Sequence, residues 1–213
     1  MRNLYYLAIE GPIGVGKTSL ANLMSEKLSA RLVLEKFEEN PFLQDFYEDP
    51  DRFAFQVQLF FLLQRYQQQQ ELRQVDMFHN LLISDYMFVK DRLFASLNLN
   101  ERDLVLYETV AAHLEKNIIN PDLVIYLQAD TETLMKNVAK RGRDFEKNLS
   151  WDYLDAVNQV YSEYFFSYQD TPLVIINTND IDFVENEDDL KEVIQYIREP
   201  VTGTKFFNPA AEL

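Results

Sequence analysis

Apolar residues gather in short runs along the chain, and longer amphipathic stretches separate these runs. Runs of four or five residues that are rich in β-branched and aromatic side chains have the length and composition of buried strands. The predicted strands cover residues 5–9, 31–35, 81–85, 123–127 and 173–176. The stretches between them repeat apolar positions three or four residues apart, as helices do. This alternation predicts an α/β fold, a doubly wound five-stranded parallel sheet with right-handed crossovers.

The longest predicted helix covers residues 52–74 and has apolar side chains on nearly every face, so we expect it to be mostly buried. Asp130 or Thr131 can cap the helix predicted over 131–140, and Gly142 can end it. Further helices are predicted over residues 18–28, 42–47, 91–98, 101–116, 151–168 and 190–197. Residues 1–213 are predicted to form a single domain, with residues 200–213 as a tail that either docks or stays loose.

The charge of the chain bears on its partners. Its formal net charge of −15 repels a polyanion, and the densest basic cluster, residues 136–147, suits only a few phosphates. We therefore expect a small phosphorylated ligand rather than a nucleic acid. The acidic run at residues 185–189 is interpreted as helix-dipole and solubility charge rather than a metal site.

Cysteine is absent from the chain and histidine occurs twice, which argues against disulfides and a zinc site. No apolar run approaches the length of a membrane span, and the first strand begins too early to leave room for a secretory signal. The expectation is a cytoplasmic protein without a membrane partner.

Residues 11–18 read Gly-Pro-Ile-Gly-Val-Gly-Lys-Thr and match the phosphate-binding P-loop, G-x-x-x-x-G-K-[ST]. A predicted strand precedes the motif and a predicted helix follows it, which argues against a glycine-rich turn of another kind. Inward-pointing N–H groups and the helix N-terminus would bind the phosphates of ATP. Lys17 would reach the β- and γ-phosphates, and the Thr18 hydroxyl would hold Mg²⁺. The expected ATP-binding residues are Gly11, Pro12, Ile13, Gly14, Val15, Gly16, Lys17, Thr18 and Ser19.

Two carboxylates, Glu35 and Asp85, end predicted strands, and ligands of such sheets bind beyond the carboxyl ends of the strands. Phosphoryl transfer needs positioning, a metal and charge stabilisation. Asp85 is placed to bind Mg²⁺, and Glu35 fits the base that accepts a hydroxyl proton. The alternative for each is a surface acid, which the neighbouring P-loop makes the weaker interpretation.

Gln58 and Arg65 lie two helical turns apart and share a face of the long helix. A buried arginine needs an acid, which Asp91 could supply, and the three side chains would suit a nucleobase edge. A partly wet stripe on the helix explains the pattern equally well.

Arg141 and Arg143 flank Gly142 just after a predicted helix. Two arginines on such a segment suit a lid that closes over the transferring phosphate. A basic helix C-terminus that neutralises its dipole is the weaker alternative.

Several of these stretches together resemble the deoxynucleoside kinase family, which includes the deoxycytidine, deoxyguanosine and deoxyadenosine kinases. The likeness runs from Leu7 to about Val184, and its pieces are specific in their order and spacing. Besides the P-loop with Glu10 before it, they are Phe-Tyr-Glu-Asp-Pro at 46–50, Phe-Gln-Val-Gln at 55–58 with Arg65, Asp-Arg-Leu-Phe-Ala at 91–95, and Lys-Arg-Gly-Arg at 140–143.

The resemblance implies a role for each matching position. Glu35 would be the general base for the 5′-hydroxyl, and Tyr47 and Glu146 would hold the sugar 3′-hydroxyl. Lys17 would act on the phosphates with the lid arginines. The base-reading set would be Gln58, Arg65 and Asp91, with Phe94 as an aromatic wall. The arginine–aspartate pair argues against thymidine as the main substrate. A homodimer formed through helices is implied as well, and the apolar stripe Leu104, Leu106, Val110 and Leu114 could serve that interface or the core.

The chain departs from the family pattern at two positions. Tyr86 follows the metal-binding acid where the family has an arginine, for which Lys90 could compensate, and Asn137 replaces a lid-helix arginine. The Asp-Tyr-Met-Phe form resembles bacterial purine-preferring members. The leading hypothesis is therefore transfer of the ATP γ-phosphoryl group to deoxyadenosine or deoxyguanosine.

Three alternatives stay open. The first is a deoxycytidine-preferring or broad-specificity deoxynucleoside kinase. A nucleoside monophosphate kinase should carry more arginines between Glu35 and Arg65 than this chain has. A non-catalytic nucleotide-binding subunit conflicts with retention of the catalytic residues. A GTPase is a weaker interpretation still, because it would need Asp-x-x-Gly after the third strand and Asn-Lys-x-Asp for guanine, and neither is present.

Overall fold

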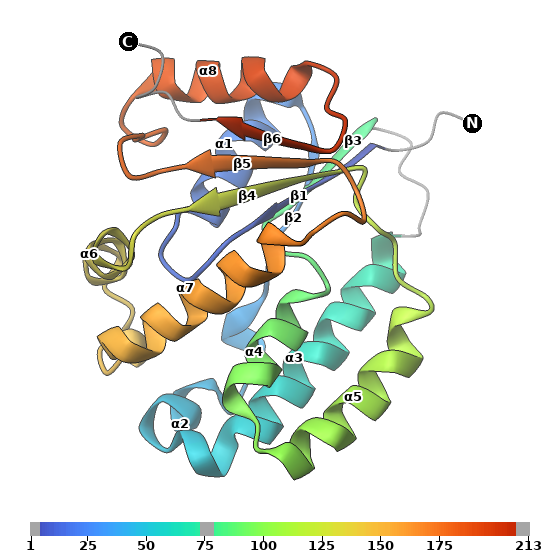
Figure 1. Cartoon of the computed structure of the whole chain (residues 1–213), viewed down its shortest axis with the longest axis vertical. Coiled ribbons are helices and arrows are strands. Elements are labelled where there is room, and N and C mark those ends of the chain that lie inside the picture. Colours follow the sequence, from blue (N-terminus) through green and yellow to red (C-terminus); the bar gives the residue numbers. More distant parts are fainter. Residues whose placement is uncertain (1–4, 73–78, 208–213) are drawn as a thin grey trace.

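A sheet of six parallel strands runs through the computed structural model, which describes residues 5–72 and 79–207 (Figure 1). The strand order is β2-β3-β1-β4-β5-β6. The strands are β1 (Tyr5–Glu10), β2 (Arg31–Val33), β3 (Leu81–Ser84), β4 (Leu123–Gln128), β5 (Leu173–Asn177) and β6 (Thr204–Phe207). Because β1 lies between β3 and β4, the loop after β1 opens where the strand order reverses, which is the usual ligand crevice of such sheets.

The parallel α/β fold was predicted correctly, but the number of strands was wrong. The sixth strand, β6, pairs with β5 and places Phe207 opposite Ile176. Its sequence, Thr-Lys-Phe-Phe, alternates exposed and half-buried residues and lacks the continuous apolar run of a central strand. Residues 204–207 are therefore docked rather than loose, and residues 208–213 of the predicted tail lie outside the described residues.

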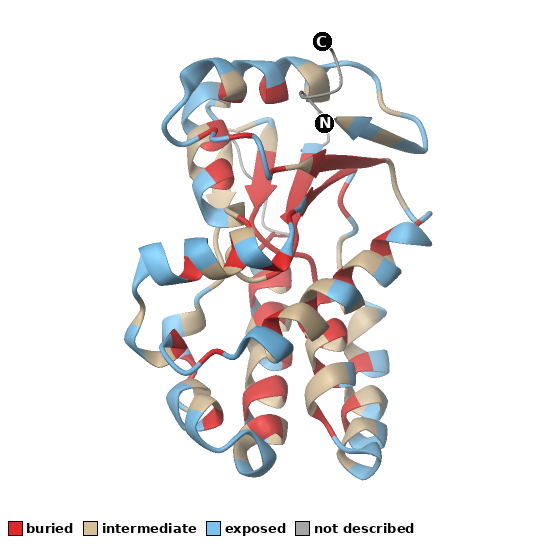
Figure 2. Ribbon diagram, turned by 60° about the vertical axis from the view of Figure 1, so that its left-hand side comes forward, coloured by how far each residue is buried: buried red, intermediate tan, exposed pale blue. Residues whose placement is uncertain are grey.

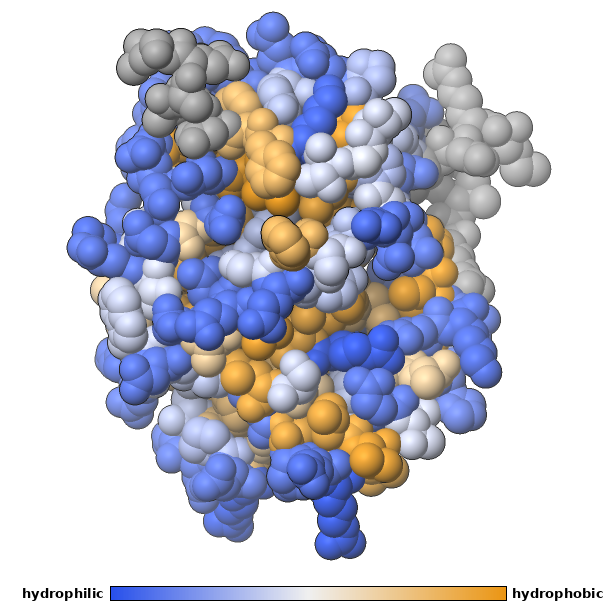
Figure 3. Space-filling model, in the orientation of Figure 1, coloured by the Kyte–Doolittle hydropathy of each residue, from blue (hydrophilic) through white to orange (hydrophobic). Residues whose placement is uncertain are grey.

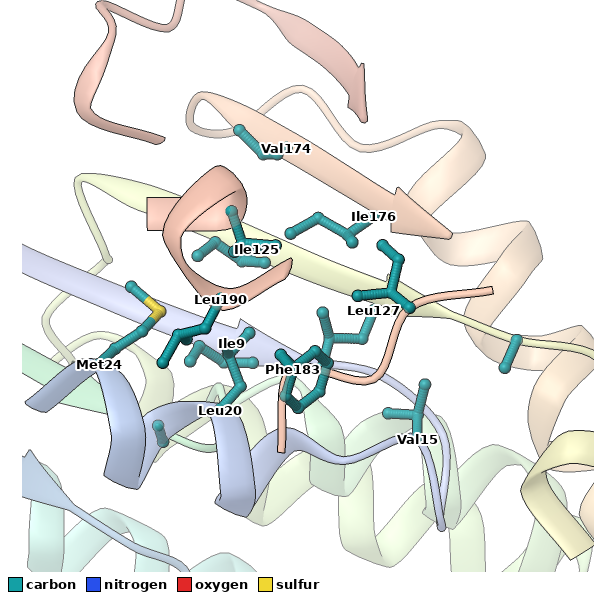
Figure 4. Packing of buried hydrophobic residues seen from close by; sticks show 14 of the residues in the cluster. Ile9, Val15, Leu20, Met24, Ile125, Leu127, Val174, Ile176, Phe183 and Leu190 are labelled. Carbon is teal, nitrogen blue, oxygen red and sulfur yellow. The ribbon is translucent and has the colours of Figure 1, made fainter. Parts of the chain in front are cut away.

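Helices cover both faces of the sheet. On one face, α1 (Lys17–Leu28) and α8 (Glu187–Arg198) pack on alternate residues of β1, β4 and β5 (Figure 4). On the other face, α3 (Pro50–Leu72), α4 (Lys90–Asn98) and α7 (Trp151–Phe166) pack on the intervening residues. Figure 2 shows the buried strands between these layers. The remaining helices are α2 (Leu43–Glu48), α5 (Glu101–Glu115), α6 (Thr131–Arg141) and two 3₁₀ turns, Phe37–Glu39 and Asp144–Glu146.

Helix α3 differs from its prediction. Many of its apolar side chains are only half-buried, and Leu63 is 49% exposed. Its polar residues Gln58, Arg65, Gln68 and Gln69 are buried instead. The helix therefore contributes a polar face to the interior beside the sheet. The prediction of a mostly buried helix was wrong because α3 packs against α2, α4 and α5 but leaves part of its surface, including Leu63, exposed.

The helix ends follow local sequence signals. Asp130 caps α6 by accepting a hydrogen bond from the Thr133 N–H at 2.7 Å, and Gly142 ends the helix in the left-handed region. Helix α8 begins three residues earlier than predicted, because Asn186 caps it and the acidic run forms its first turn. Within the described part of the chain, no helix is long and apolar enough to cross a membrane.

Candidate active site

The P-loop connects β1 to α1 and is packed tightly against α6. Gly14 has a φ of +87°, and a Cβ there would lie 2.7 Å from the Leu134 carbonyl oxygen, so only glycine fits. Lys17 Nζ donates to the carbonyl oxygens of Gly11 and Pro12, at 2.8 Å each. Burial, and then the charge of Lys90, lower the pKa of Lys17 to about 7. The ammonium group is thus held in a position where an anion would stabilise it.

Not every predicted P-loop residue contacts this crevice through its side chain. Val15 points into the core between α1 and the sheet, and Ser19 is exposed on α1. Only their backbone groups are available to a phosphate at the loop. Ile13, Lys17 and Thr18 do line the adjoining pocket.

Asp85 joins the P-loop to the segment after β2. Its Oδ2 accepts a hydrogen bond from the Thr18 hydroxyl at 2.6 Å, and its Oδ1 accepts one from the Glu35 backbone N–H at 2.8 Å. Mg²⁺ in phosphoryl-transfer sites is usually held by one or two protein oxygens plus substrate phosphates. The Thr18–Asp85 pair fits that pattern, and the described residues include no separate cluster of three acidic or histidine ligands.

Arg65 links the two predicted halves of the site. Its guanidinium forms ion pairs with Glu35 on one side and Asp91 on the other. The sequence indicated the pairing with Asp91 but not the one with Glu35. Glu35 lies two residues beyond the end of β2, and this extra length brings its carboxylate to Arg65. A second cation, Lys90, pairs with the other oxygen of Glu35.

Two residues that line the pocket beside Arg65 carry unpaired polar atoms. Gln58 Oε1 and Asp91 Oδ2 are buried and have no hydrogen-bond partner among the described residues. Burial raises the pKa of Asp91 to about 6, although Arg65 and Lys90 act in the opposite direction. An unsatisfied buried acceptor is costly, so two such atoms favour a ligand that brings donors.

The predicted lid arginines meet Glu146. Arg141 binds this carboxylate with both Nε and Nη2, at 2.6–3.1 Å, and Arg143 lies 3.6 Å from it. The Arg143 guanidinium also stacks 3.8 Å above the Phe37 ring. Since Arg141 and Arg143 line the same pocket as Lys17, the P-loop and the basic segment share one crevice.

A single pocket collects most of the predicted site. Its space of about 810 Å³ is continuous with solvent. Of the predicted residues it is lined by Ile13, Lys17, Thr18, Glu35, Tyr47, Gln58, Arg65, Asp85, Asp91, Phe94, Arg141, Arg143 and Glu146. The sequence did not predict its aromatic wall of Phe37, Phe61, Phe145 and Tyr153, because isolated aromatic residues carry no motif.

Two polar residues, Tyr86 and Asn137, contact residues of the site without lining the pocket. Tyr86 is fully buried, donates to Gln68 at 2.7 Å and lies beneath the Arg65 guanidinium, 5.5 Å from ring centre to Cζ. Asn137 donates to the Gly14 carbonyl oxygen at 2.9 Å and so joins α6 to the P-loop. The two departures from the family pattern therefore make contacts of their own.

Glu10 is a further residue that sequence reasoning did not assign. Its buried carboxylate accepts hydrogen bonds from the backbone N–H groups of Gly11 and Met87, at 3.0 and 2.6 Å. It thereby fixes the start of the P-loop relative to the segment that precedes α4. The sequence signal that could have identified Glu10 was its position directly before the P-loop motif.

Comparison with known proteins agrees with this geometry. The family model for deoxynucleoside kinases matches residues 7–202. This chain belongs to the deoxynucleoside kinase family. The deoxyguanosine kinase of Bacillus subtilis (strain 168) is 31% identical to it, over 93% of this chain and 99% of the relative. The deoxyadenosine kinase of Dictyostelium discoideum is 32% identical, over 95% of this chain and 82% of the relative.

A solved structure supports the same assignment. The deoxyadenosine kinase from M. mycoides, with the products dCMP and a flexible dCDP bound, superposes with a TM-score of 0.79 at 25% identity. The match covers 91% of this chain and 98% of that chain. The protein is thus a phosphotransferase that converts a deoxynucleoside to its monophosphate.

Proposed function

We propose that this deoxynucleoside kinase transfers the γ-phosphoryl group of ATP to the 5′-hydroxyl of deoxyadenosine or deoxyguanosine. The observation that carries the proposal is the position of Arg65, which joins Glu35 to Asp91. A candidate base for the hydroxyl and a candidate reader of the nucleobase are thereby held on one guanidinium, next to the P-loop.

The free acceptors beside Arg65 support a base that carries an amino group. Gln58 Oε1 and Asp91 Oδ2 would be satisfied by the exocyclic amino group of adenine, guanine or cytosine. Thymine has no such group. The names of the two relatives above, deoxyguanosine kinase and deoxyadenosine kinase, favour a purine, while a second Bacillus subtilis relative is named deoxyadenosine/deoxycytidine kinase. Deoxycytidine therefore stays in the test below.

The roles proposed for the other residues follow from their places in the pocket. Glu35 accepts the proton of the 5′-hydroxyl, while Tyr47 and Glu146 hold the 3′-hydroxyl and Phe94 flanks the base. Lys17, Arg141 and Arg143 stabilise the charge on the transferring phosphoryl group.

Mg²⁺ is the proposed cofactor. The Thr18 hydroxyl and the Asp85 carboxylate lie side by side next to the P-loop and would hold the ion. When bound, it would neutralise negative charge that develops on the phosphates during transfer.

The proposal also concerns assembly and location. Figure 3 shows apolar surface over the helical layer. In α5, Val105 is 69% exposed and Leu106 is 53% exposed. Such a face supports a homodimer formed through helices. Leu104, Val110 and Leu114 of the predicted stripe are only half-buried, and they pack on the helix cluster.

We further propose that residues 1–213 act as one domain in the cytoplasm, which the cysteine-free composition supports.

The experiment incubates the purified protein with ATP, Mg²⁺ and each of the four deoxynucleosides, and separates the products by chromatography. We expect deoxyadenosine or deoxyguanosine to give the highest kcat/KM. A Lys17→Met variant prepared in the same way controls for contaminating kinases. Higher efficiency with deoxycytidine would overturn the purine preference, and turnover of deoxynucleoside monophosphates alone would favour a monophosphate kinase.

A further inference from the structure

Lys90, the first residue of α4, is a buried lysine that the roles above leave unused. It is 7% exposed, and its ammonium group pairs with Glu35 Oε2. Burial, and then the charge of Arg65, lower the pKa of Lys90 to about 8. A buried cation of this kind needs an anionic partner wherever it moves within the pocket.

Both oxygens of Glu35 are engaged by cations. Arg65 binds Oε1 and Lys90 binds Oε2, so a 5′-hydroxyl would have to compete with a cation for either oxygen. A general base needs an oxygen within hydrogen-bond reach of the proton that it accepts. Each oxygen keeps a second lone pair, but it is a weaker acceptor while it binds a cation, so Glu35 would act better as a base once one of the two cations has moved.

Arg65 is the less mobile partner. A second carboxylate, Asp91, holds its guanidinium from the other side, and the rings of Phe61 and Tyr86 lie 5.0 and 5.5 Å from its Cζ. Lys90 has a flexible four-carbon stem, and its Nζ lies 5.8 Å from the Phe94 ring centre. Lys90 is thus the cation that can turn away from Glu35.

The direction in which Lys90 can turn is set by Lys17. Both lysines line the same pocket, where Lys90 is buried and Lys17 is half-buried. Their ammonium groups therefore place two positive charges in one crevice beside the P-loop. The like charges repel each other, and an anion placed between them would relieve both. The P-loop next to Lys17 is where the γ-phosphate would lie.

We propose that Lys90 is a catalytic residue that passes from Glu35 to the γ-phosphoryl group when ATP binds, which frees Glu35 Oε2 for the 5′-hydroxyl. The proposal rests on the proposed function of the same site. In the transfer, the 5′-oxygen forms a bond to the γ-phosphorus, and its proton passes to Glu35 Oε2. The bond from that phosphorus to the β–γ bridging oxygen breaks, and its electron pair leaves with ADP.

The test compares affinities for ADP and for the non-hydrolysable analogue AMPPNP, measured by calorimetry with Mg²⁺ present. If Lys90 contacts the γ-phosphate, Lys90→Met should weaken AMPPNP binding about tenfold or more, while ADP binding changes by less than about twofold. In steady-state assays kcat should fall about 10²- to 10³-fold, with the deoxynucleoside KM within about threefold of the unmodified enzyme. Lys191→Met, on an exposed lysine of α8 paired with Asp188, is the matched control and should change none of these values.

Lys90→Arg keeps the charge and should recover part of both the AMPPNP affinity and kcat. Lys90→Gln keeps a hydrogen-bond donor without the charge and should behave like Lys90→Met, which covers the case in which Lys90→Met does not fold. Equal losses for ADP and AMPPNP, or no loss for either, would overturn the role of Lys90. If the unmodified protein phosphorylates a deoxynucleoside while Lys90→Gln retains its kcat, the proposed function stands and only this inference fails.

Discussion

Asp85 Oδ1 accepts a hydrogen bond at 2.8 Å from the backbone N–H of Glu35, so a side chain at the end of β3 fixes the backbone beyond β2. The other oxygen of Asp85 binds Thr18 at the start of α1. One carboxylate therefore sets the distance between the P-loop and the candidate base. Because Glu35 is held through its backbone, its side chain can be changed without removing this anchor.

The first prediction uses that anchor. Glu35→Gln should leave ATP affinity unchanged within about twofold and lower kcat by about 10²-fold or more, because an amide cannot accept the hydroxyl proton. Steady-state kinetics and ATP binding by calorimetry measure the two effects. Glu39→Gln is the matched control, because Glu39 is an exposed glutamate that lies four residues after Glu35 and pairs with Lys36. Unchanged turnover in Glu35→Gln would remove Glu35 from the role of base.

A second prediction concerns the packing of α6 on the P-loop. Gly14→Ala places a Cβ 2.7 Å from the Leu134 carbonyl oxygen, so the loop or α6 must shift, and we expect ATP affinity to fall at least about tenfold. Gly203→Ala is the matched control, since Gly203 also has a positive φ but no atom within 4 Å of the added Cβ. It should keep its ATP affinity. Similar affinities in both variants would show that the P-loop tolerates the shift.

A third prediction follows from the pKa of Asp91, which burial raises from 3.8 to about 6. Below that pH the Asp91 carboxyl group is neutral, so it can no longer accept a charge-assisted hydrogen bond from the amino group of the nucleobase. Deoxynucleoside affinity should therefore fall as the pH drops through about 6, by up to about tenfold per unit. Calorimetric titrations between pH 5 and 8 measure it. Asp91→Asn should bind weakly throughout and show no such step, and a wild-type affinity that is constant across this range would contradict the role of Asp91.

The same shift has the opposite effect on stability. Because the folded pKa of Asp91 lies above the unfolded one, its favourable contribution is complete below about pH 4 and is lost as the pH rises through about 6. Acidification should thus weaken substrate binding while Asp91 itself favours the folded state more. Measuring both deoxynucleoside affinity and the free energy of unfolding against pH therefore separates a binding role of Asp91 from a structural one.

The sequence predicted the site best where a motif fixes local backbone geometry. The P-loop, the placement of Asp85 beside Thr18 and the Arg65–Asp91 pair were predicted, because spacing along strands and helices determines which side chains meet. Glu35 was expected to end a strand over 31–35, but β2 ends at Val33. The ion pairs of Glu35 with Arg65 and Lys90 were not found. They depend on how three segments pack in space, which local spacing does not encode.

The sheet shows the same limit. The strands of the sheet centre are buried on both faces and form apolar runs, which periodicity detects. The edge strand β6 is buried on one face only and is four residues long, so its pattern is too short to recognise. Helix α3 was misjudged for a related reason, because its apolar residues do not all face the interior.

The two phenylalanines of β6 provide the last prediction. Phe207 is half-buried and packs on Tyr196 of α8, with ring centres 4.9 Å apart, whereas Phe206 is 71% exposed. Phe207→Ala should therefore lower the free energy of unfolding by about 1–2 kcal/mol, less than the cost at a fully buried site. Phe206→Ala should change it by less than about 0.5 kcal/mol, since the Tyr196 hydroxyl bonds the Phe206 carbonyl oxygen, which the substitution keeps. Urea unfolding, monitored by circular dichroism, measures the loss in the free energy of unfolding for both variants. Equal losses would show that β6 is not docked through Phe207.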